Sequence, residues 1–273
     1  MRQTFLAMIL VLGIVFSSPL FALAADSAEA KEGRGAETEK EKKGITPQTN
    51  HQKEKRILKG LEPQGQKLTE PASMPVYQPP RRGAPGGRVG GGTRGIGDEL
   101  ITLYVLAPNH VGLTVEEQPT LYWYLSKSTN LPIEVTIIED QAIYPLLEKR
   151  ISLPVQQGIH PIRLKDYNIH LSPGKEYRWF LAVVPAPDRR SRDIIAGGMI
   201  SRVEAQEALR VKLTQADRRE IPRIYAEAGI WYDAVTAISD LMDEVPNDTL
   251  LRKQRAALLK QVGLSEVAEQ EMK

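Results

Sequence analysis

Apolar and polar residues alternate along seven short segments between residues 99 and 203, which is the pattern of half-buried β-strands. The clearest alternation follows the turn dipeptide Pro173-Gly174. One face of that predicted strand carries only large apolar side chains, which are Tyr177, Trp179, Leu181 and Val183. The seven predicted strands are Leu100–Leu106, Pro119–Leu125, Ile133–Glu139, Lys149–Leu153, Gly158–Leu164, Lys175–Val184 and Ile194–Val203.

Turn residues separate these segments at a spacing that favours a two-sheet sandwich of the immunoglobulin or fibronectin type III kind over residues 99–203. Tyr177 occupies the position of a tyrosine corner, whose hydroxyl bonds to the backbone a few residues upstream. Trp179 stands where antibody-type domains place a disulfide cysteine. We expect Trp179 and Trp123 to fill the centre of the core, so all three aromatic residues have structural roles.

After Val203 the apolar period changes from two to about 3.6, which predicts a helical tail over residues 204–273. Four residues recur 34 positions later, which is the period of tetratricopeptide repeats: Tyr225, Gly229, Ala234 and Ile238 return as Leu259, Gly263, Ala268 and Met272. The predicted fold is therefore mainly β plus α, a sandwich followed by a short tetratricopeptide-like tail.

The tail holds one full repeat and part of a second, whereas about three are usually needed to bury the apolar faces. Trp231 lies at the turn between two predicted helices, and we expect the sandwich to cover it. The outer face of the tail is predicted to contact a partner through Leu250, Leu258 and Val262.

The N-terminal part of the chain divides by composition into two further segments. Residues 1–24 combine Arg2, a run of apolar residues and Ala22-Leu23-Ala24, which predicts a cleaved signal peptide and no stable membrane span after cleavage. Residues 25–80 are dense in charge and poor in large apolar residues, which predicts a disordered linker.

Residues 81–98 are rich in arginine and glycine and leave two interpretations open. Arg81, Arg82, Arg88 and Arg94 could surround an anionic glycan or a phosphate group. Alternatively, the glycines only let the backbone lie close against the sandwich. The spacing Gly90-x-Gly92-x-x-Gly95 does not indicate a dinucleotide site, because that motif needs a strand before it and a helix after it, whereas here prolines precede it and a predicted strand follows.

The 273 residues carry a net charge of +2 and no cysteine. Near-neutral charge gives no electrostatic reason to expect nucleic-acid binding, and the lack of cysteine excludes thiolate catalysis and cysteine-based zinc sites. Serine-hydrolase, zinc-protease and phosphate-loop motifs are missing, and the four histidines show no metal-ligand spacing. We therefore expect no enzyme activity, no metal and no cofactor.

Several short elements after residue 80 occur in a specific combination. They are Arg81–Arg88, Gly90–Gly95, Gly112–Thr114, Pro119-Thr120, Trp123-Tyr124, Tyr177–Trp179 and Gly229–Ala234. This combination resembles domain-of-unknown-function family 928, a family of exported bacterial proteins. Its members often carry a cysteine shortly after Thr-Arg-Gly, where this chain has Ile96-Gly97. The resemblance supports the predicted architecture and implies no activity.

Together these observations predict an exported, non-enzymatic protein-interaction or scaffold module in the periplasm or outside the cell. We expect an envelope protein as partner, with an anionic glycan or phosphate bound by the arginine/glycine segment as the alternative.

Overall fold

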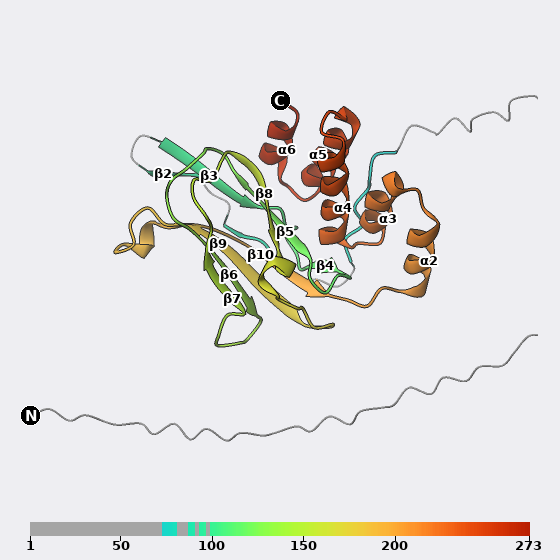
Figure 1. Ribbon diagram of the computed structural model, residues 1–273, viewed down its shortest axis with the longest axis horizontal. Coiled ribbons are helices and arrows are strands. Elements are labelled where there is room, and N and C mark those ends of the chain that lie inside the picture. The colour runs from blue at the N-terminus through green and yellow to red at the C-terminus, as the bar shows by residue number, and fades with distance from the viewer. Residues whose placement is uncertain (1–72, 81–86, 91–92, 97–98) are drawn as a thin grey trace, which may run out of the picture. The chain divides into compact units, whose positions relative to one another are not determined.

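The computed structural model describes residues 73–80, 87–90, 93–96 and 99–273, and these belong to one compact unit. It contains two β-sheets followed by five helices, which confirms the predicted mixture of β and α structure (Figure 1). The strands are β1 (Val89–Gly90), β2 (Thr93–Ile96), β3 (Glu99–Val105), β4 (Gly112–Thr114), β5 (Thr120–Leu125), β6 (Ile133–Glu139), β7 (Leu147–Arg150), β8 (Gly158–Arg163), β9 (Glu176–Val183) and β10 (Ile194–Arg202). The predicted signal peptide and residues 25–72 of the predicted linker lie outside the described residues.

One sheet has the order β1-β10-β9-β6-β7, with β4 also paired to β10, and the other has the order β2-β3-β5-β8. All pairs are antiparallel except that of β4 with β10. The seven predicted strands match β3, β5, β6, β7, β8, β9 and β10 within a few residues. The strands β1, β2 and β4 were not predicted.

The apolar core follows from the alternation along the strands. On β9, Tyr177, Trp179, Leu181 and Val183 are buried as predicted. Trp123 on β5 is also buried, but it packs its ring against His160 at 4.9 Å, whereas the Trp179 indole bonds to the helical tail. The two tryptophans thus both belong to the core, with different polar neighbours.

The helices are α2 (Glu207–Gln215), α3 (Ile221–Glu227), α4 (Trp231–Glu244), α5 (Thr249–Gln261) and α6 (Ser265–Glu271). Gly229 and Gly263, 34 residues apart, follow α3 and α5, and both have φ of +76°. After Gly229, the Ile230 N–H donates to Tyr225 O at 2.9 Å, and after Gly263 the Leu264 N–H donates to Leu259 O at 2.9 Å. The sequence repeat is therefore a repeat of helix ends, each closed by a glycine in the left-handed region.

The start of α4 inserts two aromatic side chains between the helices and the sheets. The indole N–H of Trp231 donates to Leu106 O at 2.8 Å, which confirms that the β-sheet part of the chain covers this residue. The Tyr232 hydroxyl accepts from the Trp179 indole N–H at 3.0 Å and donates to Met199 O at 2.9 Å. Gly112 makes room for this ring, because a Cβ there would lie 2.6 Å from the Tyr232 ring.

The predicted partner-binding face of the tail is wrong for two of its three residues. Leu258 is 0% exposed and Val262 is 6% exposed, and both belong to the core that the helices share with the sheets. Leu250 is half-buried. These side chains pack inside the molecule because the second sheet lies against the helices, as the Tyr104 hydroxyl bond to Glu266 of α6 at 2.8 Å illustrates.

Residues 73–80 form an ordered extended segment on the helices, although they fall in the predicted disordered linker. The Gln78 N–H donates to Ala226 O at 3.0 Å, and the Tyr77 N–H donates to the Gln261 side chain at 2.8 Å. Tyr77 is buried, with its ring edge against Trp231 at 5.0 Å. Tertiary contacts with one aromatic residue thus order a stretch whose composition alone predicts disorder.

Candidate functional site

A cleft of about 320 Å³ opens where the segment before β5, the end of β8 and the helices α3 and α4 meet. We call it the charged cleft. The antiparallel pairing of Thr120 with Arg163 brings the first two of these elements together. The ionisable side chains that line the cleft are Glu116, Arg163, Lys165, Tyr225, Tyr232, Asp233 and Asp240.

Asp233 lies at the start of α4 and lines the charged cleft while being only 5% exposed. Neither of its carboxylate oxygens has a well-formed hydrogen bond among the described residues. Burial raises the pKa of Asp233 to about 7; the neighbouring Glu116 also raises this pKa, whereas the Thr114 hydroxyl and the Val115 N–H oppose the rise. An acid of this kind is a candidate functional group, because burying an unpaired carboxylate destabilises the fold.

Tyr225 of α3 lies in the same group of side chains. Burial raises its pKa to about 12, with the Asp233 and Glu116 carboxylates adding to the effect. Two cations also line the cleft: Arg163 is the last residue of β8, and Lys165 follows it in a short 3₁₀ turn. The carboxylates that line the cleft thus come from α4 and the segment after β4, and the cations come from β8 and the turn after it.

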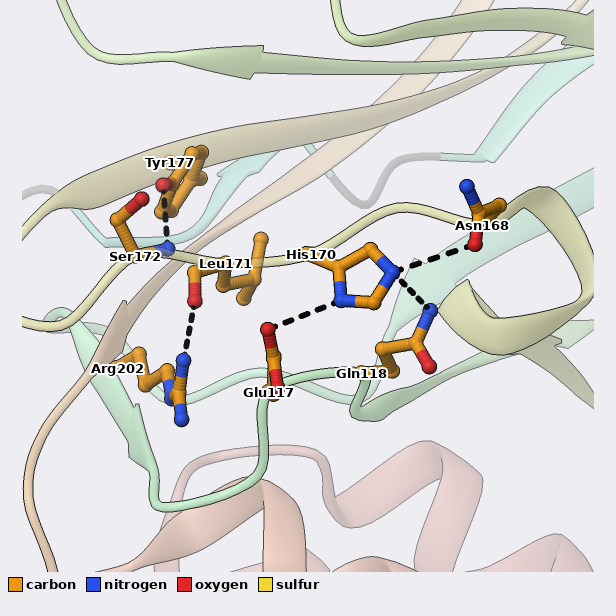
Figure 2. Close-up of polar contacts among 8 residues, drawn as sticks. All are labelled: Glu117, Gln118, Asn168, His170, Leu171, Ser172, Tyr177 and Arg202. Carbon is orange, nitrogen blue, oxygen red and sulfur yellow. Dashed lines mark hydrogen bonds and ion pairs between the residues drawn. The ribbon is translucent and has the colours of Figure 1, made fainter. Parts of the chain in front are cut away.

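A hydrogen-bonded group of side chains around His170 includes Gln118 (Figure 2), and Gln118 lines the cleft. The His170 ring lies between two segments, with Nδ1 3.0 Å from Glu117 Oε1 and Nε2 3.2 Å from Asn168 Oδ1. Gln118 Nε2 lies 3.3 Å from the same Nε2. Both His170 and Glu117 are about half exposed, so this pair fixes the loops at the rim without burying charge.

Tyr177 and Arg202 hold the chain beyond His170 in place. The Tyr177 hydroxyl accepts from the Ser172 N–H at 2.9 Å, which confirms the predicted bond to the upstream backbone (Figure 2). The Arg202 guanidinium donates to Leu171 O at 2.7 Å. The rim of the cleft is thus anchored to β9 and β10.

The family described as Domain of Unknown Function (DUF928) matches residues 89–272, more than half of the chain. The chain belongs to this family. No curated protein matches the sequence. The charged cleft lies entirely within the part of this DUF928 protein that the family covers.

Of the four arginines predicted to bind an anion, the structure describes the side chain of Arg88. Arg88 is half-buried, and its Nη1 donates to Ala107 O at 3.2 Å and to Val262 O at 3.1 Å. These bonds join the arginine/glycine segment to the end of α5, so Arg88 has a structural role. Arg81 and Arg82 lie outside the described residues, and of Arg94 only the backbone, paired with Ile101, is described.

The predicted structural residues of the DUF928 tail lie between its helices. Ala234 is 0% exposed, Tyr225 is half-buried, and Gly229 ends α3. A Cβ on Gly229 would lie 2.7 Å from Gln78 O.

The charged cleft itself was not predicted from the sequence. Asp233 stands among the apolar residues of a helix start, between Tyr232 and Ala234, and that position is the one signal that could have drawn attention to it. Within the described ranges no three His, Asp or Glu side chains are placed to bind a metal ion. No helix of the described part is both long and apolar enough to cross a bilayer.

Proposed function

We propose that this DUF928 protein is an exported, non-enzymatic interaction module of the bacterial envelope, which contacts a protein partner in the periplasm or outside the cell. The proposed architecture is an immunoglobulin-like sandwich with a tetratricopeptide-like tail. The tyrosine corner at Tyr177 and the paired helix ends at Gly229 and Gly263 support that assignment.

One surface observation carries the proposed function. The loop between β6 and β7 exposes three large apolar side chains close together in the sequence, with Ile143 85%, Tyr144 81% and Leu146 43% exposed. Side chains of this size are rarely left in water as a group unless they contact another molecule. Tyrosine is also among the residues that most often anchor protein interfaces.

The loop behind this tip is fixed by its own hydrogen bonds. The Ala142 N–H donates to Glu139 O at 3.0 Å, and the Leu146 N–H donates to Ile137 O at 2.8 Å. Ion pairs of Glu139 with Lys175 and of Asp140 with Arg178 neutralise the charges beside it. An ordered apolar tip loses little conformational entropy on binding and suits an uncharged partner surface.

The test compares partner capture by the mature chain and by an Ile143→Ser/Tyr144→Ser variant, using cross-linking in envelope extract. Val211→Ser/Met272→Ser is the matched control, because it removes two exposed apolar side chains elsewhere. We expect the tip variant to lose a cross-linked partner that the wild type and the control retain. Identical cross-linked species from all three proteins would refute the tip as the contact surface.

Export is tested separately by N-terminal sequencing of the protein purified from its host. The mature chain is expected to begin at or near Ala25. A mature cytosolic chain that begins at Met1 would contradict the proposed location.

A further inference from the structure

The charged cleft contains five formally charged side chains, and none of them forms an ion pair within 4 Å among the described residues. They are Glu116, Arg163, Lys165, Asp233 and Asp240. Elsewhere in the described chain opposite charges pair readily, as Arg255 and Glu271 do between α5 and α6. Charges of both signs that form no ion pair within 4 Å therefore line one concave surface.

The two signs lie on different elements. Glu116 and Asp233 come from the segment after β4 and from α4, and they are close enough to influence each other electrostatically. Arg163 and Lys165 come from β8 and the turn that follows it. The Arg163 charge lowers the pKa of Asp240, against the larger effect of burial, but the two side chains form no salt bridge within 4 Å.

Asp233 is the residue that distinguishes this cleft from ordinary hydrated surface. A carboxylate that is 95% removed from solvent and lacks a well-formed hydrogen bond destabilises the folded chain, whereas asparagine would fit the same space without charge. Such a group is understandable where a cation approaches it during function. The Tyr225 ring, on the same side of the cleft, adds an aromatic surface suited to an ammonium group.

We propose that the charged cleft binds a small zwitterion, with its ammonium group beside Asp233 and Glu116 and its carboxylate beside Arg163 and Lys165. A ligand with one charge would leave the lining charges of one sign without a partner, whereas a zwitterion provides a partner for both signs. A volume of about 320 Å³ is at the lower end of the range for small-molecule sites, so the ligand has the size of an amino acid or a dipeptide.

The test measures binding of amino acids whose charged ends are separated by graded distances: glycine, β-alanine, 4-aminobutyrate and 6-aminohexanoate. Propylamine and propionate serve as probes with a single charge. Titrations followed by ¹H–¹⁵N chemical shifts are read at the backbone amides of β8 and α4. At least one amino acid is expected to bind ten or more times tighter than either single-charge probe.

Two variants test the cations and the carboxylate of the cleft separately. Arg163→Gln/Lys165→Gln should reduce binding of that amino acid to the level of propylamine, and Asp233→Asn should reduce it to the level of propionate. Lys149→Gln/Arg192→Gln, which neutralises two exposed cations outside the cleft, should leave binding unchanged. The proposal is overturned if no amino acid binds tighter than the single-charge probes, or if the Arg163/Lys165 variant binds as the wild type does. The Arg163→Gln/Lys165→Gln variant changes one half-buried and one exposed position, so it tests the proposal independently of Asp233.

Discussion

Replacing Tyr232 with Phe removes the single hydroxyl that joins α4 to both β9 and β10. In the native protein this hydroxyl accepts from the Trp179 indole N–H and donates to Met199 O, and the side chain is only 1% exposed. The variant leaves the buried Trp179 N–H donor and the partly buried Met199 O acceptor without this partner. Each such loss destabilises by about 1–3 kcal/mol, so we expect the free energy of unfolding to fall by about 2–4 kcal/mol.

Urea unfolding followed by tryptophan fluorescence and by circular dichroism measures this loss. With a slope of about 2 kcal/mol per molar urea, the midpoint should fall by about 1–2 M while the slope stays unchanged. Tyr225→Phe is the matched control, because the Tyr225 hydroxyl makes no hydrogen bond among the described residues, and its midpoint should shift by less than about 0.3 M. Equal midpoints for the two variants would refute the idea that the Tyr232 hydroxyl holds the tail to the sheets.

Two further predictions concern positions in the tail. Gly229→Ala and Gly263→Ala should each lower the free energy of unfolding by about 1–2 kcal/mol, because alanine is strained in the left-handed backbone conformation. Gly229→Ala should lower it by at least about 1 kcal/mol more. The added Cβ at position 229 would lie 2.7 Å from Gln78 O, whereas the one at position 263 would meet nothing closer than 3.6 Å. Deleting residues 73–80 should abolish this difference in urea midpoints, and a difference that persists would contradict the proposed collision. Asp233→Asn should stabilise the protein above pH 7 by at most about 4 kcal/mol. The pKa of the Asp233 carboxyl is about 7 in the folded chain and 3.8 in the unfolded chain, so the wild type loses stability as the pH rises from 3.8 to 7. Unfolding curves at pH 4 and pH 8 test this, and a wild type whose stability changes with pH in parallel with the variant would exclude Asp233 as the cause.

The alternation of apolar and polar residues was sufficient to predict the strands that bury one face in the core between the two sheets. The strand β9 is the clearest case, because its alternating side chains and the turn before it specify both the face and the Tyr177 corner. The strand β4 was missed because three residues, Gly112–Thr114, give too short a pattern, and their pairing with β10 is a long-range event. Residues 73–80 were missed for a related reason, since Tyr77 is buried by residues more than 150 positions away.

The candidate site depends on contacts that no local pattern records. Glu116, Arg163 and Asp233 are far apart in the sequence, and each alone resembles an ordinary surface charge. The cleft forms because β5 pairs with β8 while α4 packs beside β4 and β5. Only Asp233, within an apolar helix start, carries a sequence signal of its own.

The error at Leu258 and Val262 shows how the two parts of the chain depend on each other. Counting repeats predicts an uncovered apolar face, because that rule assumes that repeats are covered only by further repeats. Here the outer face of the sheet that contains β3 and β5 takes the place of the missing neighbour: Tyr104 bonds to Glu266 of α6, and Val262 O accepts from Arg88 of the arginine/glycine segment. A surface for a partner must therefore be sought away from the helices, and in the described chain the exposed side chains of Ile143 and Tyr144 satisfy that condition.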